Sequence, residues 1–203
     1  MKIGVSFLTS KDIKNDLEKL DKTSANYIHV DVMDGKFVEK INEPFLNIKD
    51  LKLNKPLDVH LMVEDPKDYI LKYKDLNTEY ITIHHEIKED KIKLLHLIKS
   101  YNIKCGIAIN PDTNINVLQE YLDHIDLILI MSVVPGKGGQ TFIENTTNKL
   151  EQVKELNKNK NIIINIDGGI NNETVKKVIK SDMVVSGSYI LNGNYEERIN
   201  SLK

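Results

Sequence analysis

The sequence is poor in several residue types: its 203 residues include one cysteine, no tryptophan and a single arginine. A lone cysteine, Cys105, excludes an internal disulfide and a zinc site built from several cysteines. We expect it to be a buried small side chain. Every other cation is a lysine. Because Arg198 lies five residues from the C-terminus, an arginine clamp on a phosphate or carboxylate is not expected.

Long hydrophobic runs are also missing. The longest, residues 127–134, has about eight residues, whereas a membrane-spanning helix needs about 20. The N-terminal apolar stretch is too short for a signal peptide. A net charge of −2 gives no strong field that would select nucleic acid or a membrane surface. We therefore expect a cytoplasmic protein with neither nucleic acid nor membrane as a partner.

The sequence shows an alternation of short Ile- and Val-rich runs with Lys- and Glu-rich stretches at helical spacing. No Pro-, Gly- or Ser-rich linker interrupts it, so we expect a single domain over residues 1–203. The predicted strands are 2–8, 27–33, 57–63, 80–85, 104–110, 127–133, 161–167 and 183–189. The predicted helices lie near 12–21, 44–52, 66–75, 89–100, 114–122, 142–158, 172–180 and 194–202.

This alternation predicts an α/β fold with parallel strands joined by crossover helices. Eight units in about 200 residues fit a closed (β/α)₈ TIM barrel at its lower size limit. The alternative is an open, doubly wound sheet, which usually carries a glycine fingerprint after its first strand. Leu8-Thr9-Ser10 follows the first strand here, without glycine. We therefore favour a single TIM barrel.

Polar residues interrupt two strands that should otherwise be apolar. Side chains alternate between the faces of a strand, so His29, Asp31 and Met33 share one face, and His60 and Met62 share the matching face of the next strand. The valines between them suit packing against helices. The polar face must therefore point into the barrel, where an unpaired carboxylate is costly.

These inward residues should converge where the strands end. His29, Asp31, His60 and Asp167 would then form a set of imidazole and carboxylate ligands for one divalent metal ion per chain, such as Zn, Fe, Mn or Co. The alternative is that each is an ordinary core residue or part of a structural ion pair. The methionines on the same faces either fill the core or line the site; they are Met33, Met62 and Met131.

Three glycine-containing turns follow late strands, at residues 135–140, 168–169 and 186–188. Glycine lets backbone N–H groups approach a ligand closely, and TIM barrels often bind phosphate at their late loops. Each turn alone is commonly just a turn. Together they predict a small phosphorylated substrate held without arginine.

The motifs in combination resemble a known family. Their order and spacing are those of ribulose-phosphate 3-epimerases, and the resemblance extends from end to end. It implies a TIM barrel that interconverts D-ribulose 5-phosphate and D-xylulose 5-phosphate in the pentose phosphate pathway. The motifs are His29–Gly35, His60–Val63, Asn110–Thr113, Met131–Gln140 and Asp167–Ile170.

The resemblance also implies residue roles. Asp31 and Asp167 would be the acid/base pair on opposite faces of a phosphorylated ketose, and together with His29 and His60 they would hold the metal. His84, with Glu86, fits the family pattern, and we interpret it as a support for the ligands. The residues that would bind substrate are Ser6, His60, Gly136, Lys137, Gly138, Gly139, Asp167, Gly168, Gly169, Gly187 and Ser188.

Several loop residues depart from the family pattern. Val134 replaces a usual Asn or Asp, Lys137 replaces a usual Phe, and the loops at 9–12 and 41–45 diverge. They leave allulose-6-phosphate 3-epimerase as the alternative activity. A related decarboxylase needs an Asp-x-Lys motif, and Met33 occupies that lysine position. A non-catalytic phosphate-binding barrel is the third interpretation, and homo-oligomerisation is left open.

Overall fold

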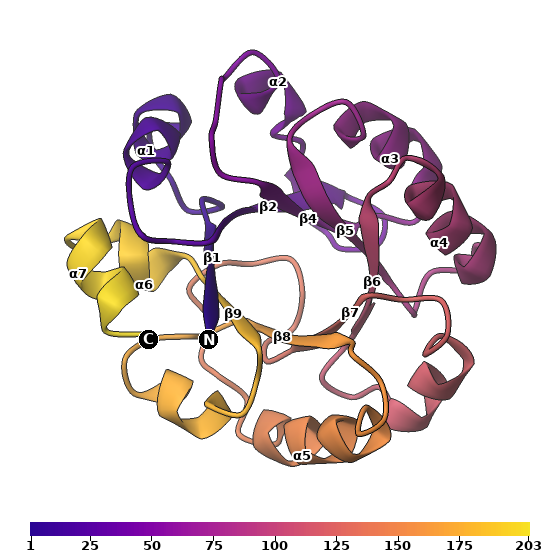
Figure 1. Ribbon diagram of the computed structural model, residues 1–203. Coiled ribbons are helices and arrows are strands. Elements are labelled where there is room, and N and C mark those ends of the chain that lie inside the picture. The colour runs from indigo at the N-terminus through magenta and orange to yellow at the C-terminus, as the bar shows by residue number, and fades with distance from the viewer.

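The computed structural model describes all 203 residues and contains a closed barrel of eight parallel strands (Figure 1). The barrel closes because the first strand pairs in parallel with both the second and the last. The predicted TIM barrel is thus confirmed. The barrel strands are β1 (Lys2–Ser6), β2 (Tyr27–Asp34), β4 (Leu57–Met62), β5 (Thr78–His84), β6 (Lys104–Ile109), β7 (Leu127–Met131), β8 (Ile163–Asp167) and β9 (Met183–Ser186).

Helices surround the barrel on its outside (Figure 1). Asp12 and Asp90 each begin a helix by accepting a hydrogen bond from a backbone N–H in its first turn, as N-cap residues do. The helices are α1 (Ile13–Leu20), α2 (Phe45–Ile48), α3 (Lys67–Tyr73), α4 (Lys91–Ser100), α5 (Thr146–Leu156), α6 (Ser188–Leu191) and α7 (Tyr195–Asn200), with 3₁₀ helices η1 (Ile115–Glu120) and η2 (Thr174–Val178).

The structure corrects some predicted boundaries. The strand expected over 183–189 ends at Ser186, because Gly187 leaves the extended conformation (φ −112°, ψ −90°) and α6 begins at Ser188. The helices expected near 114–122 and 172–180 are the short 3₁₀ helices η1 and η2. A two-residue strand, β3 (Ile41–Asn42), pairs antiparallel with the end of β2.

The core has two layers, and the alternation of side chains along the strands assigns each residue to one of them. Val30 and Val59 belong to the large cluster between strands and helices. Leu129, Met131 and Met183 belong to a smaller cluster inside the barrel. The inward face of β2 and β4 therefore carries their histidines, carboxylates and methionines, as the alternation predicted. None of the helices combines the length and hydrophobicity that crossing a membrane requires.

Candidate active site

The four predicted metal ligands converge inside the barrel, with one ligand atom from each lying within 4.8 Å of every other. His29 Nε2 lies 3.6 Å from Asp31 Oδ1 and 3.8 Å from Asp167 Oδ2. His60 Nδ1 lies 3.7 Å and 3.6 Å from the same two oxygens. The two nitrogens and two oxygens therefore surround one small volume. We call these four residues the ligand cluster.

The partner of His29 determines which of its nitrogens faces this volume. Asp58 lies directly opposite His29 in the register of β2 and β4. Its Oδ2 accepts a hydrogen bond from His29 Nδ1 at 2.7 Å. Burial opposes a charged His29, but the carboxylates of Asp58 and Asp31 outweigh it and hold its pKa well above the usual range. A histidine binds a metal only as the neutral ring. In neutral His29, Nδ1 keeps the hydrogen that it donates to Asp58, and the Nε2 lone pair points to the cluster.

His60 is oriented by a chain of hydrogen bonds that runs away from the cluster. Its Nε2 lies 2.8 Å from Nε2 of His84, whose Nδ1 lies 3.0 Å from Glu86. Burial lowers the pKa of His84 to about 4, so its ring is neutral at pH 7. A neutral His84 that donates from Nδ1 to Glu86 must accept from His60 Nε2–H. The His60 Nδ1 lone pair is then directed at the cluster.

Glu86 is itself held in place at the end of this chain. It accepts hydrogen bonds from the Asn110 backbone N–H and the Thr113 hydroxyl. Burial raises its pKa, but these bonds and the contact with His84 outweigh burial and lower the pKa to about 2. Glu86 is therefore ionised at neutral pH, and it fixes the ring orientation of His84 and, through it, of His60.

The two aspartates of the cluster have pKa values displaced in opposite directions. Burial raises the pKa of Asp167 to about 7, and repulsion from Asp31 and Asp58 adds to this. Burial also opposes ionisation of Asp31, but the His29 and His60 imidazoles outweigh it and lower its pKa. The Ser6 hydroxyl donates to Asp31 Oδ2 at 2.6 Å. One carboxylate is thus held ionised, while the other titrates near neutral pH.

The cluster fits a divalent cation. His29 Nε2 and His60 Nδ1 are buried nitrogens without a hydrogen-bond partner, and such atoms are rare unless a ligand completes them. A tetrahedral ion with bonds of about 2.1 Å keeps its ligands roughly 3.4 Å apart. The four nitrogen–oxygen separations, 3.6–3.8 Å, are close to this value. Two imidazoles and two carboxylates suit zinc, manganese, iron or cobalt.

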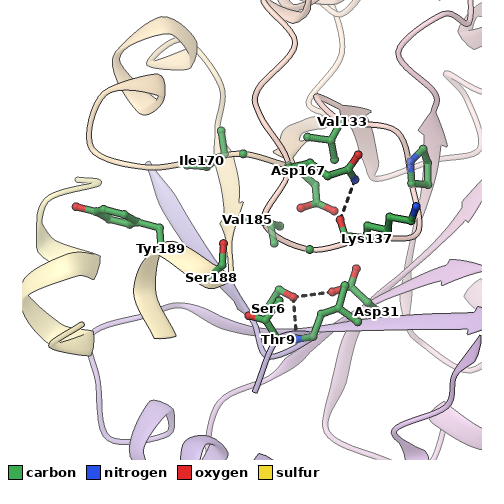
Figure 2. A pocket seen from close by; sticks show the side chains of 18 of the residues that line it. Ser6, Thr9, Asp31, Val133, Lys137, Asp167, Ile170, Val185, Ser188 and Tyr189 are labelled. Carbon is green, nitrogen blue, oxygen red and sulfur yellow. Dashed lines mark hydrogen bonds between the residues drawn. The ribbon is translucent and has the colours of Figure 1, made fainter. Parts of the chain in front are cut away.

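A cavity of about 300 Å³ opens above the cluster at the carboxyl ends of the strands (Figure 2). Asp31 and Asp167 reach its surface, whereas His29 and His60 are buried beneath, with at most 1% of either side chain exposed. His60 was also predicted to bind substrate, but it does not line the cavity. The other predicted residues in the lining are Ser6, Met33, Met62, Met131, Gly136, Lys137, Gly138, Gly139, Gly168, Gly169, Gly187 and Ser188.

The glycines after β8 allow a close approach of backbone segments beside Asp167. Gly168 has a φ of +117°, and a Cβ there would lie 2.4 Å from Val133 Cγ2. Gly169 has a φ of +65°, and its Cβ would lie 2.6 Å from the Phe142 nitrogen. Side chains are therefore strained at both positions. The Ser132 hydroxyl lies within hydrogen-bonding distance of the Gly168 carbonyl oxygen, at 2.6 Å, which fixes this turn.

Two residues of this region were not among the predicted site residues. Asp58 lies on the same face of β4 as His60, but its contact with His29 becomes apparent only from the register of β2 and β4. Arg198 was set aside as a ligand-binding residue because it is near the C-terminus, but that position does not keep it from the cavity. It lines the cavity together with Tyr189 and Asn192. Cys105 is buried, as expected.

The closed barrel and its cluster define the class: a TIM-barrel protein with a candidate metal site on the floor of a cavity at the strand ends. Residues 2–191 match the model of the Ribulose-phosphate 3 epimerase family, and the chain belongs to this family. It is 34% identical over 199 residues to the ribulose-phosphate 3-epimerase of Bacillus subtilis (strain 168), covering 94% of this chain and 92% of the relative.

Other similarities agree with this assignment. The ribulose-phosphate 3-epimerase of Helicobacter pylori (strain J99) is 38% identical over 197 residues, covering 94% of this chain and 90% of the relative. Among solved structures, a tryptophan synthase A-subunit from Pyrococcus furiosus superposes with a TM-score of 0.71 at 15% identity, covering 100% of this chain and 96% of the other. At that identity the likeness concerns the fold alone.

Proposed function

We propose that this protein is a metal-dependent epimerase that interconverts D-ribulose 5-phosphate and D-xylulose 5-phosphate by two-base proton transfer at the third carbon. The observation that carries the proposal is the pair of cavity-lining carboxylates, Asp31 and Asp167, which belong to a single ligand cluster in a member of this family. Epimerisation beside a ketone removes a proton from one face of the carbon and returns a proton to the other face.

The two carboxylates fit the two roles. Asp31 comes from β2 and Asp167 from β8, so they can approach a bound ketose from different sides. One carboxylate takes the proton from the third carbon and leaves an enediolate, and the carboxylic acid opposite donates its own proton to the other face. The reverse reaction exchanges the two roles. Without a cation, Asp31 is held ionised while burial raises the pKa of Asp167, so the two carboxylates differ in how readily they hold a proton.

His29, Asp31, His60 and Asp167 would hold the cation. A divalent ion at this position supplies charge that offsets the negative charge developing on the enediolate oxygens. Ser6 donates to Asp31 and keeps that carboxylate oriented. Met33, Met62 and Met131 line the cavity beside the carboxylates. Their thioethers cannot donate a proton, so they would not compete with the acid/base pair.

The phosphate of the substrate would bind at the glycine turns. Gly139, Gly169, Gly187 and Ser188 line the cavity without adding a carboxylate to it. In Figure 2, Ser188 and Tyr189 lie on the side of the cavity away from Val133 and Lys137. A ketose phosphate would then span from these turns to the carboxylates. The decarboxylase alternative has no support, because Met33 and not a lysine lines the cavity after Asp31.

The decisive test is proton NMR in deuterated water with the protein loaded in turn with zinc, manganese, iron or cobalt. Deuterium uptake at the third carbon of D-ribulose 5-phosphate, together with formation of D-xylulose 5-phosphate, is the expected result. Faster turnover of allulose 6-phosphate would assign the divergent loops to a hexose substrate. No exchange with either sugar in any metal form would contradict the proposal and favour a non-catalytic phosphate-binding barrel.

A further inference from the structure

We propose that Arg198, the single arginine of the chain, is a binding residue for the substrate phosphate. The inference rests on the proposed function, because it assigns the group that Arg198 would contact. Arg198 lies on α7, the last helix, and its side chain lines the same cavity as Asp31 and Asp167. Closure of the barrel therefore brings the C-terminal helix to the cavity.

The guanidinium is held in place but not neutralised. Its Nη1 donates to the Tyr189 carbonyl oxygen at 3.0 Å, and its Cζ lies 4.5 Å from the centre of the Tyr189 ring. Arg198 forms no ion pair with any carboxylate of the protein, and it makes no other side-chain hydrogen bond. A guanidinium has five N–H donors. Most of them therefore remain free, on a half-buried side chain already oriented by stacking.

The charges around the cavity indicate an anion as the partner of Arg198. The only carboxylates in the lining are Asp31 and Asp167, and both belong to the ligand cluster. Arg198 lines the cavity together with Ser188, Tyr189 and Asn192, which carry no charge. A guanidinium binds phosphate oxygens through two parallel N–H bonds, which a lysine cannot do. A sugar phosphate bound with its ketone at the ligand cluster would place its phosphate dianion near Arg198.

Gly193 leaves room for the guanidinium in its observed position. A Cβ on Gly193 would lie 2.3 Å from Nε and 2.9 Å from Cζ of Arg198. These atoms end a flexible side chain, so an alanine would displace the guanidinium without a large change in the backbone. Gly193→Ala therefore keeps the positive charge and moves it, whereas Arg198→Ala removes it. Comparing the two variants distinguishes the effect of the position of the cation on phosphate binding from the effect of its presence.

The test compares Arg198→Ala, Arg198→Lys and Gly193→Ala with the wild type, with Lys176→Gln as the control that removes an exposed lysine. KM and kcat are measured with D-ribulose 5-phosphate, and binding of inorganic phosphate is measured by ³¹P NMR. Arg198→Ala should raise KM and the phosphate dissociation constant about 10- to 100-fold, as expected for a lost charged hydrogen bond. The kcat should change little, because such binding is shared by ground and transition states.

The other variants sharpen the test. Arg198→Lys should recover part of the affinity, Gly193→Ala should weaken phosphate binding several-fold, and added ethylguanidinium should restore binding to Arg198→Ala. A structural role alone would not give that rescue. KM and phosphate affinity within twofold of wild type in both Arg198→Ala and Gly193→Ala would overturn the inference. Should Arg198→Ala fail to fold, Gly193→Ala and Arg198→Lys decide by the same criterion.

The phosphate titration keeps this inference distinct from the proposed function. A wild type that turns over neither sugar but binds phosphate in an Arg198-dependent manner supports the inference and contradicts the epimerase activity. A wild type that epimerises D-ribulose 5-phosphate, with phosphate binding unaffected in all variants, supports the activity and overturns the role of Arg198.

Discussion

His29 and Asp58 stand opposite each other on β2 and β4, and the Asp58 carboxylate accepts the Nδ1 hydrogen of His29 over 2.7 Å. A carboxylate in this position fixes the ring and makes the remaining nitrogen a better metal ligand. Asp58 is 1% exposed, so water cannot replace it. The register of β2 and β4 therefore determines the direction in which His29 Nε2 points.

Asp58→Asn should therefore weaken metal binding without removing a ligand. The neutral amide still accepts a hydrogen bond, but it no longer polarises the ring, and loss of such partners typically costs 10- to 100-fold in affinity. Competition for Zn²⁺ against a chelating dye measures the change. Asp68→Asn, an exposed change on α3, should leave the affinity unaltered. Equal affinities in wild type and Asp58→Asn would show that His29 is oriented by packing alone.

Each carboxylate of the proposed acid/base pair should control one face of the substrate. In Asp31→Asn and Asp167→Asn, net epimerisation should fall about 10²- to 10⁴-fold, the usual contribution of a general acid or base. Exchange of the third-carbon hydrogen with deuterated water should persist in one epimer for one variant and in the other epimer for the second. Metal content is measured for both. Equal loss of exchange in both epimers by metal-replete variants would contradict the two-base assignment.

The half-buried Glu86 should make stability depend on pH in the acid range. Its pKa is about 2 in the folded protein against an ordinary value of 4.5. A lowered carboxyl pKa stabilises the fold above pH 4.5, and this contribution is lost as the pH falls from 4.5 towards 2. Glu86→Gln should thus lower the free energy of unfolding at pH 7 by about 2 kcal/mol, allowing for partial solvent screening.

Urea unfolding at several pH values, with a chelator present throughout, tests this expectation. The difference between wild type and Glu86→Gln should shrink between pH 4.5 and pH 3. Glu89→Gln, an exposed change, serves as the control and should give no pH-dependent difference. A Glu86→Gln difference that stays constant from pH 7 to pH 3 would show that the pKa of Glu86 is not lowered by folding.

The turn after β8 should tolerate no side chain. Gly168→Ala places a Cβ against Val133 and imposes a left-handed φ of +117°, which we expect to cost about 1–3 kcal/mol of stability. Because Asp167 precedes this glycine, kcat should fall as well. Gly4→Ala is the matched change: its φ is ordinary, and the nearest atom to its Cβ is the flexible end of Met183 at 3.1 Å, with Val185 and His29 at ordinary contact distances. Similar unfolding midpoints for the two variants would contradict the strain at Gly168.

The barrel and most of its cavity could be predicted because residues that face opposite sides of a strand alternate in the sequence. The alternation of His29, Asp31 and Met33 with valines indicated which side chains point inward, and the burial of these residues agrees. Boundaries were less predictable. The last strand ends at Ser186 because Gly187 turns the chain. The apolar residues Val184 and Val185 before it do not indicate where the strand ends.

The contacts within the site depend on tertiary geometry, which the sequence does not give even where it points to the right residues, such as His84 and Glu86. Glu86 acts on His60 only through His84, a relation that exists between neighbouring strands and a loop and not within one segment. Arg198 is far in sequence from every ligand, and only the closed barrel brings α7 to the cavity. Proximity to the C-terminus was therefore a poor guide to distance from the site.

Closure of the barrel also has a consequence for how the chain is made. Lys2 lies opposite Met183, so β1 cannot pair with its second neighbour until β9 has been synthesised. All four residues of the ligand cluster precede Met183. A nascent or prematurely terminated chain can therefore carry every metal ligand while two strand edges remain open. Such edges pair readily with other chains, and pairing of β9 with β1 and β8 removes them.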